Sequence, residues 1–491
     1  MSLTRRQFIK TSAAATAAIS VPVVASSRVL GANDEIRVGL VGTGGRGTGA
    51  HLPGFEGQKG VTVVAVCDAD HGRMARAAEI IESKYHHKAR QYPDMRKMFE
   101  RTDIDVIGNA TQIYWHGLST IWACQAGKHV YVEKPLSFFI WEGRQMVNAA
   151  RNHNRIVQCG SQHRSLRAVR EAIRWTREGH LGKIKYITCF ACKPRGPIGK
   201  RDTPLPIPDS IDYDLWCGPA KKLPIYRNQL QYDCRYVWNT GVGESVDQGV
   251  HELDVARWWL GESRLPRRVM SMGGRFVFDD VGEVPNVHIM YYDFPTAPIL
   301  HEMHNLSKAK GTSEKRTLHG IWVGLIVACE GGSIHVKPYE MTRTCVVYDP
   351  QGKEIRSFSG GENHFVNFIE AVRSGRREHL NADVEEGHIS AATGHTANIS
   401  YRLGKVATQK EQRSQVENIP ALNEMYDRFL VHLKAHEIDP NTATLSPWLE
   451  IDREKECFKD HEKANEIVRG YYREPYVVPD LSGESAKELK P

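Results

Sequence analysis

The stretch that decides the fold is Glu-Ile-Arg-Val-Gly-Leu-Val-Gly-Thr-Gly-Gly-Arg-Gly, residues 35–47, followed by Val-Thr-Val-Val-Ala-Val-Cys-Asp, residues 61–68. The apolar run in each part is short and rich in β-branched residues, which predicts two strands buried on both faces of a parallel sheet. The glycines between the runs predict a tight turn that leads from the first strand into a helix. The stretch therefore predicts the start of a β-α-β fold.

The three glycines Gly42, Gly44 and Gly47 fit the pattern G-x-G-x-x-G, which places a pyrophosphate at the N-terminus of the following helix. This pattern alone is weak, because many loops are rich in glycine. Here it follows a strand, and Asp68 ends the next strand. A carboxylate there accepts hydrogen bonds from the adenosine ribose and repels a 2′-phosphate. We therefore predict NAD, in preference to NADP, with Thr43 in the binding loop.

The composition of the whole chain is that of an ordinary globular protein. Its 491 residues are 41% hydrophobic and 25% charged, which predicts two or more domains. The net charge is +7, but no run of basic residues marks a face, so we expect no nucleic-acid partner. Cys189 and Cys192 form a C-x-x-C pair in a strand-like run without a second pair, which favours strand packing over a metal site.

The N-terminus has the layout of an export signal. Arg5 and Arg6 are followed by Lys10 and then by a small, weakly apolar stretch, residues 11–25. Twin arginines direct a chain to the Tat machinery, so we expect an exported, periplasmic or extracytoplasmic protein. The stretch is interrupted by Pro22 and is short for a membrane span, so no stable span is expected. Because the Tat route carries folded proteins, we expect a tightly held cofactor that is recycled within its site.

A lysine follows a predicted strand at the edge of the sheet where ligands bind. Residues 129–132 predict the strand, and Glu133, Lys134 and Pro135 follow it directly. In parallel sheets ligands bind outside the carboxyl ends of the strands. A lysine beside a nicotinamide ring can hydrogen-bond a sugar hydroxyl and help to relay its proton. Taken alone, a Glu-Lys pair at such a position is more often a surface ion pair.

A second polar group stands at the start of a predicted helix, which has an apolar stripe at Val250, Leu253, Ala256 and Leu260 and which Gly261 ends as a C-cap. Asp247 and His251 are four residues apart, so they share one face at the helix start. A histidine there can act as general base on a hydroxyl, and the aspartate can orient it or bind a neighbouring hydroxyl. Asp254, on nearly the same face, leaves a metal site conceivable, but we expect no metal. Without the upstream motifs His251 would be interpreted as a core histidine.

Weaker candidates for substrate contacts lie further along the chain. Gln162 and Arg164 follow a strand that should approach the cleft. Arg195, together with Lys193, leads into a long Pro-rich loop and could bind an acidic sugar. A solvated basic edge is an equal alternative for both pairs. Trp238 would stack on a sugar face, although a buried tryptophan is the more common case.

Several motifs occur together and in one order. They are the glycine loop, the helix start at 111–116, Ala-Gly-Lys-His-Val-x-x-Glu-Lys-Pro at 126–135, and the Asp247-x-x-x-His251 pair. The combination resembles the glucose-fructose oxidoreductase, inositol dehydrogenase and rhizopine-catabolism family (Gfo/Idh/MocA) over roughly residues 36–403. The Tat signal and Trp238-Asn-Thr-Gly resemble the exported bacterial branch of that family.

This resemblance implies NAD(P)-dependent oxidation or reduction of sugars and polyols. Lys134, Asp247 and His251 match the catalytic lysine and the Asp/His pair of the family. The resemblance also places Thr111, His116, Glu133 and Lys134 beside the cofactor. The chain departs from the family where Gln112 and Ile113 follow Thr111, so the loop on the nicotinamide side is expected to have a different shape.

The predicted fold class is α/β. A doubly wound parallel Rossmann sheet is followed by an α/β domain with an open, mostly antiparallel sheet, which the resemblance makes a homo-oligomer interface. The expected segments are a Tat signal and linker at 1–32, an NAD(P)-binding domain at 33–160, a substrate and oligomerisation domain at 161–413, and a partly irregular C-terminal extension at 414–491.

Three functions remain open on these motifs. The first is an exported NAD-dependent oxidoreductase acting on a sugar, polyol or glycoside, in which His251 or Lys134 takes the hydroxyl proton. The second is a redox-neutral NAD-dependent glycosidase or lyase that works through a transient 3-keto sugar and needs a second base, for which His163 and His116 are candidates. The third is a non-catalytic sugar or cofactor sensor on the same fold, against which the retention of Lys134, Asp247 and His251 argues.

Overall fold

The computed structural model describes residues 35–483. The predicted Tat signal and linker, residues 1–32, lie outside the described residues, as do residues 484–491 at the other end. Across the described part of the chain, none of the helices combines the length and the apolar character that crossing a membrane requires.

The first sheet is parallel throughout and has the strand order β3-β2-β1-β4-β5-β6. From β1 the chain adds β2 and β3 on one side and then β4, β5 and β6 on the other, so the switch point lies between β1 and β4. Open α/β sheets bind ligands at such a switch point. Sequence patterns predicted every strand except β3, which is only three residues long. The strands are β1 (Ile36–Val41), β2 (Val61–Cys67), β3 (Arg90–Tyr92), β4 (Val106–Asn109), β5 (His129–Val132) and β6 (Val157–Cys159).

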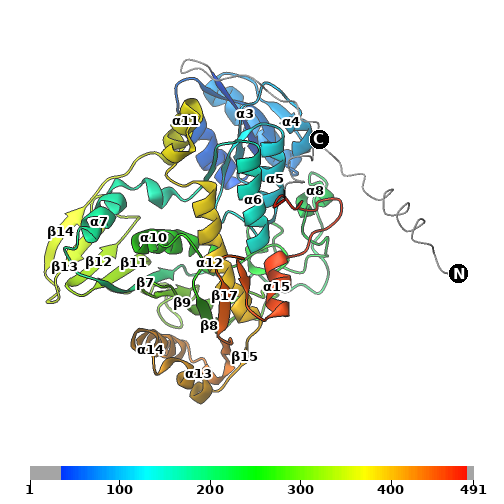
Figure 1. Ribbon diagram of the computed structural model, residues 1–491. Coiled ribbons are helices and arrows are strands. Elements are labelled where there is room, and N and C mark those ends of the chain that lie inside the picture. The colour runs from blue at the N-terminus through cyan, green and yellow to red at the C-terminus, as the bar shows by residue number, and fades with distance from the viewer. Residues whose placement is uncertain (1–34, 484–491) are drawn as a thin grey trace, which may run out of the picture.

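Helices cover both faces of this sheet, as the upper part of Figure 1 shows. One face packs against α2 (Leu52–Glu56), α3 (His71–Tyr85) and α11 (His364–Ser374), and the other against α4 (Met95–Phe99), α5 (Ile113–Gln125) and α6 (Ile140–Asn152). Helix α11 comes from the second half of the chain, and its Phe368 and Ile369 are fully buried in this core. The two halves therefore share a core and are not joined by a simple linker.

The second sheet is mixed and mostly antiparallel, with the order β14-β13-β12-β11-β7-β10-β9-β8-β16-β15 and β17 paired to β8. Only the β7–β10 pair is parallel. The sequence patterns missed β10, β13 and β14, and also the two- to four-residue strands β15 to β18. The strands are β7 (Ile184–Cys192), β8 (Arg268–Gly274), β9 (Val287–Asp293), β10 (Ile299–His304), β11 (Val323–Cys329), β12 (Gly332–Val336), β13 (Cys345–Tyr348), β14 (Glu354–Phe358), β15 (Lys405–Val406), β16 (Thr444–Leu445), β17 (Leu449–Asp452) and β18 (Cys457–Phe458).

The inner face of the second sheet packs against α7 (Arg167–Arg177), α10 (Val250–Leu260) and α12 (Val384–Arg402) in one continuous core. Helix α12 runs through the middle of the molecule in Figure 1 and contacts both α6 and β8. Because α12 touches the parallel sheet's helices on one side and the second sheet on the other, it fixes the two sheets relative to each other. The carboxyl end of β5 and the start of α10 thereby face the same space.

The C-terminal extension, which we expected to be partly irregular, contains helices and short strands as well as an irregular last part, residues 470–483. It forms α13 (Gln409–Val416), α14 (Pro420–Ala435) and α15 (Glu462–Arg469), and its short strands join the second sheet. Figure 1 shows α13 and α14 on the side of this sheet opposite α10. Charged residues of α14 face outward, and apolar residues at helical spacing form a stripe on its other face. The charged residues between them made this stripe hard to recognise in the sequence. That stripe packs on β8, β9 and β10 and comprises Leu422, Met425, Tyr426, Phe429 and Leu433.

This arrangement bears on the expected homo-oligomer. The outer face of β8, β9 and β10 is covered by the chain's own helix α14, and Met272, Ile289 and Leu300 on it are almost fully buried. A partner subunit therefore has no access to this part of the open sheet. Assembly through the remaining strands stays a prediction.

Candidate active site

The glycine loop has the shape that a dinucleotide requires. Gly42 has φ of +83°, and a Cβ atom there would lie 2.5 Å from the Ala110 carbonyl oxygen. A Cβ at Gly47 would lie 2.0 Å from the Gly42 carbonyl oxygen, whereas at Gly44 it would meet only the end of the flexible Arg73 side chain, 2.8 Å away. Two of the glycines are thus demanded by the backbone itself, and the third leaves the loop open to a ligand. The residues present fit the predicted NAD.

Asp68 ties this loop to the end of β2. Its Oδ2 accepts hydrogen bonds from the Thr43 backbone N–H at 2.7 Å and from Thr43 Oγ1 at 3.1 Å, and its Oδ1 accepts from the Asp70 N–H at 3.0 Å. Burial raises the pKa of Asp68, and these hydrogen bonds oppose the rise. Thr43 therefore orients the carboxylate and keeps the loop in register with β2. Contact of Asp68 with a ribose stays a prediction.

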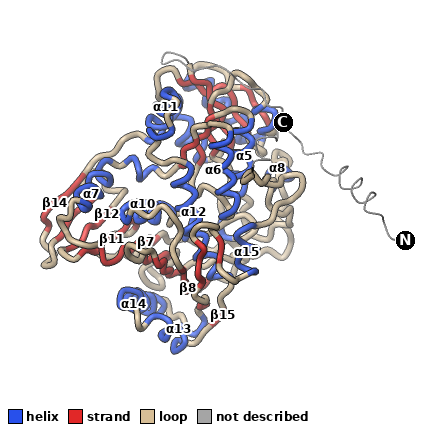
Figure 2. The backbone as a smooth tube through the Cα atoms, in the orientation of Figure 1, coloured by secondary structure: helices blue, strands red, loops and turns tan. Residues whose placement is uncertain are grey.

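A long segment of the second domain, residues 193–238, crosses to the end of β2, and we call it the bridging loop. Ile211 forms an isolated antiparallel bridge with Asp70, and the Gln231 amide donates to Asp70 Oδ2 at 3.2 Å. Its short helix α8 (Tyr213–Cys217) lies beside α5 among the tan loops on the right of Figure 2. There the Tyr114 hydroxyl donates to the Trp216 carbonyl oxygen at 2.8 Å. The bridging loop is thus fastened directly beside Asp68.

Glu133 is occupied by protein partners. Its Oε1 accepts from Arg46 Nε at 2.7 Å and lies 3.1 Å from His51 Nε2. Burial alone would raise the pKa of Glu133, but the His51 hydrogen bond and the Arg46 charge lower it to about 2. Glu133 therefore anchors the glycine loop and the helix after it to the end of β5. These contacts assign it a positioning role beside the predicted cofactor.

His116 links the two turns that border the switch point. Its Nδ1 lies 2.8 Å from the Pro135 carbonyl oxygen, and its Nε2 lies 3.2 Å from that of Thr111. The Thr111 hydroxyl in turn donates to Asn109 Oδ1 at 2.8 Å. Because both nitrogens face backbone carbonyls in a buried site, His116 is not free to exchange protons with a substrate. It fixes the turn that carries Lys134.

Lys134 and Asp247 come together from the two domains. Lys134 Nζ donates to Asp247 Oδ1 at 2.8 Å and to the Asp247 carbonyl oxygen at 2.6 Å. Asp247 Oδ2 accepts from Arg235 Nη1 at 2.7 Å. Burial alone would raise the pKa of Asp247, but the Lys134 and Arg235 charges hold it well below its usual value. Asp247 is therefore a carboxylate, and one Lys134 donor is left free of these contacts.

His251 lies beside this pair without bonding to it, because Asp247 belongs to a separate short helix, α9 (Glu244–Asp247). The His251 ring instead packs on His163, with centroids 4.6 Å apart and planes at 35°. Burial lowers the pKa of His251 well below its usual value, and the His163 and Lys134 charges add to this. Burial likewise lowers the pKa of His163 to about 4. Both rings are neutral at pH 7 and can accept a proton.

More charged side chains surround Asp247 than the sequence motifs indicated. Glu244 Oε1 accepts from Arg195 Nε at 3.1 Å and from Arg235 Nη1 at 3.3 Å. Lys193 Nζ donates to Gln248 Oε1 at 2.8 Å. Sequence reasoning missed Arg235, Glu244 and Gln248, although the charges at 235, 244 and 247 flank a glycine-rich turn, which was the one available signal.

Two of the weaker substrate candidates, Arg164 and Gln162, have other partners. Arg164 is buried, and its Nε donates to both Asp254 oxygens while its Nη2 donates to Glu386 at 2.9 Å. These ion pairs join α10 to α12, so Arg164 is engaged with two protein carboxylates, and Asp254 is not free for a metal. Among residues 35–483 no cluster of His, Cys, Asp and Glu has the arrangement of a metal site. The Gln162 amide makes a long contact of 3.4 Å with the Tyr131 hydroxyl.

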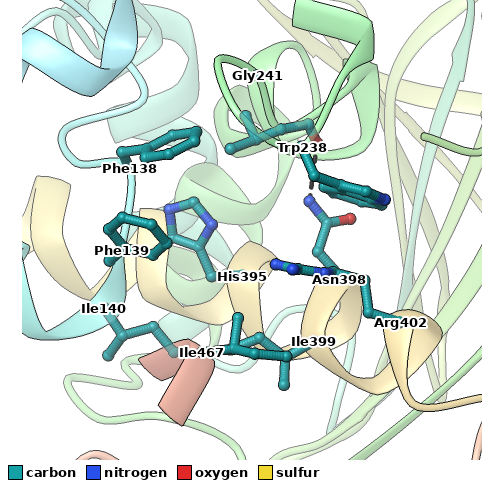
Figure 3. Close-up of a pocket in the computed structure, with 11 residues that line it drawn as sticks. Phe138, Phe139, Ile140, Trp238, Gly241, His395, Asn398, Ile399, Arg402 and Ile467 are labelled. Atoms are coloured by element: carbon teal, nitrogen blue, oxygen red, sulfur yellow. Dashed lines mark hydrogen bonds between the residues drawn. The ribbon is translucent and has the colours of Figure 1, made fainter. Parts of the chain in front are cut away.

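Trp238 lines a different, small pocket together with residues of α12, as Figure 3 shows. Its ring is covered by the Arg402 guanidinium at 5.1 Å, beside Phe138, Phe139 and His395. The small cavity they line has room for about one water molecule, about 30 Å³. Trp238 thus packs against the end of α12 and does not offer its face to a sugar at Lys134.

Comparison with known proteins agrees with this arrangement. Residues 36–161 match the oxidoreductase family with an NAD-binding Rossmann fold, and residues 182–309 match the C-terminal α/β domain of the same family. Residues 2–22 match the twin-arginine translocation signal. The chain therefore belongs to the Gfo/Idh/MocA family of oxidoreductases and carries a Tat signal sequence.

Curated relatives cover only part of the chain. A glycosyl hydrolase family 109 protein of Shewanella pealeana is 31% identical over 171 residues, which are 30% of this chain and 37% of that protein. One of Saccharopolyspora erythraea is 28% identical over 163 residues, 32% of this chain and 34% of that protein. The matches thus span about a third of these relatives, and they do not fix the activity of this chain.

Solved structures share the fold over a longer range. The WlbA dehydrogenase of Bordetella pertussis, in complex with NADH and UDP-GlcNAcA, is 18% identical with a TM-score of 0.54, covering 75% of this chain and 97% of that one. The UDP-N-acetylglucosamine 3-dehydrogenase of Acidithiobacillus ferrooxidans is 16% identical with a TM-score of 0.52, covering 74% and 97%. At this identity the likeness shows the fold.

Proposed function

We propose that this protein is an exported, periplasmic oxidoreductase that oxidises a hydroxyl group of a sugar, polyol or glycoside with bound NAD. The observation that carries the proposal is the meeting of Lys134, Asp247 and a neutral His251 at the carboxyl end of β5. Asp68, Thr43 and the glycine loop would hold the cofactor. NAD bound there supplies the hydride acceptor.

In this proposal His251 is the general base and Lys134 orients the substrate. Lys134 forms an ion pair with the Asp247 carboxylate, and an ammonium in such a pair has no lone pair with which to take a proton. Its remaining donor can polarise a substrate hydroxyl. The neutral His251 ring can take the hydroxyl proton, and His251 Nδ1 is buried without a hydrogen-bond partner, which leaves Nε2 as the working nitrogen.

The bridging loop supports a tightly held cofactor. Its Ile211 and Gln231 contact Asp70, two residues beyond the carboxylate that would meet the ribose. To leave the site, the adenosine end would have to pass a segment that is fastened at both β2 and α5. Retention suits an exported enzyme, because a cofactor loaded in the cytoplasm is not replaced outside it.

The contact between the His163 and His251 rings favours one alternative, a redox-neutral glycosidase or lyase. Oxidation of a ring carbon acidifies the neighbouring C–H, and removing that proton needs a second base beside the first. His163 is neutral and 4.6 Å from His251 by ring centroids, whereas His116 is bound to two carbonyls. The match to glycosyl hydrolase family 109 proteins also supports this alternative.

One experiment separates these functions. Protein purified without added cofactor would be denatured to identify released nucleotide, and intact protein would be incubated with free sugars and with aryl glycosides. Reduction of bound NAD by free sugars, without aglycone release, supports the oxidoreductase. Aglycone release without an added oxidant supports the redox-neutral enzyme. Absence of nucleotide, even after soaking in NAD, contradicts both and leaves the sensor.

A further inference from the structure

The charges around Asp247 do not balance. Lys134, Lys193, Arg195 and Arg235 surround the carboxylates of Asp247 and Glu244, so four cations face two anions. Burial raises the pKa of the adjacent Glu252 to about 8, so this third carboxyl group is neutral at pH 7. The neighbouring ion pairs, Arg46 with Glu133 and Arg164 with Asp254, are each matched. The site thus holds about two uncompensated positive charges, and enclosed charges are costly without a counter-ion.

The cationic side chains are partly exposed to solvent, whereas the carboxylate of Glu244 is buried. The side chains of Lys193, Arg195 and Arg235 are 26%, 25% and 24% exposed, whereas that of Glu244 is 1% exposed. A ligand entering the site therefore meets positive charge first. Oxidised nicotinamide, which carries a positive ring, would increase the excess and not relieve it.

Lys193 has the freest donors of this group. Within the described residues, its Nζ makes one hydrogen bond, to the neutral Gln248 amide, and the nearest carboxylate oxygen, Glu244 Oε2, lies 3.9 Å away. An ammonium has three donors, so two remain for a ligand. Burial lowers the pKa of Lys193, which the Glu244 charge opposes and the Arg195 and Lys134 charges reinforce. An anion bound here would remove that repulsion.

Aromatic side chains border the same cations. Tyr232 is 52% exposed with φ of +69°, a backbone conformation that bulky residues seldom adopt, and its ring lies 3.9 Å from the Arg235 guanidinium. Tyr339 is 50% exposed, stacks on Trp322 at 5.4 Å and lies 5.8 Å from His163. Exposed aromatic rings near these charged side chains suit the faces of a sugar ring.

We infer that the substrate is a carbohydrate that carries an anionic group, a carboxylate or a phosphate, which Lys193 binds with support from Arg195. This rests on the proposed function and names its substrate class. The ion-pair chain from Lys134 through Asp247, Arg235 and Glu244 to Arg195 consists of direct contacts. The anionic group is therefore held next to the position where a hydroxyl would meet Lys134 and His251.

The test is equilibrium binding to the full NAD-loaded chain by titration calorimetry. The probes are uronic and aldonic acids, their neutral parent sugars and the matching sugar phosphates. The sugar acids or the sugar phosphates should bind about ten- to a hundredfold more tightly than the neutral parents, as for a charged hydrogen bond, and less tightly at high salt. Which anionic series binds more tightly distinguishes carboxylate from phosphate.

The variants make the test specific. Lys193→Gln should abolish the preference for anions, Lys193→Arg should restore part of it, and Lys200→Gln, at an exposed ion pair with Asp279, should leave it unchanged. Equal binding of anionic and neutral sugars, no binding of any anionic probe, or an unchanged preference in Lys193→Gln would each overturn the inference. Selective anion binding without NAD reduction or aglycone release would retain this inference and refute the proposed function. Turnover of neutral sugars without anion preference would do the reverse.

Discussion

Lys134 is the side chain that links the two domains at the candidate site. It follows β5 of the first domain and donates to two oxygens of Asp247 in the second. The turn that carries it is fixed by His116, which contacts the Pro135 carbonyl oxygen. The position of one ammonium group thus depends on the packing of the whole molecule.

Replacing Lys134 by alanine should lower turnover by about 10²- to 10⁴-fold, because the substrate hydroxyl loses its polarising donor. The glycine loop, Thr43 and Asp68 are untouched, so the cofactor should remain bound. Turnover and the nucleotide released on denaturation are measured together. Lys97→Ala, at an exposed pair on α4, is the control. Loss of nucleotide from the Lys134 variant would make this lysine a cofactor-binding residue instead.

His251 should remain a competent base below neutral pH. Burial and the neighbouring His163 and Lys134 charges hold its pKa well below the usual value, so the ring stays neutral as the pH falls from 7 to 6. We therefore expect no fall in kcat/KM between pH 7 and pH 6 from protonation of His251. His251→Asn should lower kcat/KM by about 10²- to 10⁴-fold, and His180→Asn, at an exposed histidine, should not. An acid limb near 6.5 that disappears in His251→Asn would contradict the assignment.

At the scale of elements, the bridging loop is the segment that we propose encloses the cofactor. It departs from the end of β7, contacts the end of β2 and is anchored by α8 against α5. Trp216 is the centre of this anchor, with its ring 5.9 Å from Tyr114 and 5.7 Å from Tyr213. The apolar cluster around Trp216 is separate from the apolar cores that pack on the two sheets.

Replacing Trp216 by alanine should weaken this anchor by about 3–5 kcal/mol, the usual cost of emptying a buried tryptophan site. NAD should then dissociate at least about tenfold faster, since roughly 1.4 kcal/mol corresponds to a factor of ten. The nucleotide retained during dialysis is measured over time. Trp175→Ala, on α7 and remote from this loop, is the matched control. Equal retention in both variants would show that the bridging loop does not hold the cofactor.

At the scale of the whole molecule, many histidines are buried in their neutral form. Burial lowers the pKa of two of them to about 3 and of three others to about 4, namely His288 and His301, and His163, His364 and His395. The unfolded chain binds protons at these side chains below about pH 6.5, whereas the folded chain does not. Their contribution to stability is therefore complete above pH 6.5 and is lost as the pH falls toward the folded pKa values.

Stability should fall between pH 7 and pH 5. At pH 5, proton binding to each of these histidines in the unfolded chain lowers the free energy of unfolding by about 2 kcal/mol. Burial raises the pKa of Glu142 and Glu252 to about 8, which acts in the opposite direction by about 2.5 kcal/mol each. The histidines prevail because they outnumber the acids. Urea midpoints at the two pH values test this, with samples returned to pH 7 as the control for irreversible loss. A higher midpoint at pH 5 would contradict it.

Much of the fold follows from the sequence alone. The strands β1, β2, β5 and β7 have the residue bounds that their apolar patterns predicted, because short β-branched runs are local signals. The apolar stripe of α10 also predicted a helix, but the predicted helix included Asp247, which belongs to α9. The glycine loop, the switch-point edge and the Lys134 position follow from one β-α-β pattern. Family membership and the Tat signal are confirmed by the comparisons.

The remaining features depend on contacts between distant segments. Strand β10 pairs with both β7 and β9, and no local pattern revealed this. Helix α14 covers the outer face of the second sheet through a stripe hidden among charged residues. Arg235 and Lys193 join the site only because the bridging loop returns to α9, and Arg164 and Trp238 leave it because α12 supplies closer partners. The sequence alone was enough to predict the NAD-binding fold and the lysine, aspartate and histidine of the candidate site. The tertiary structure was needed to show which other side chains join them, because charge pairing and burial depend on neighbours that are far apart in the chain.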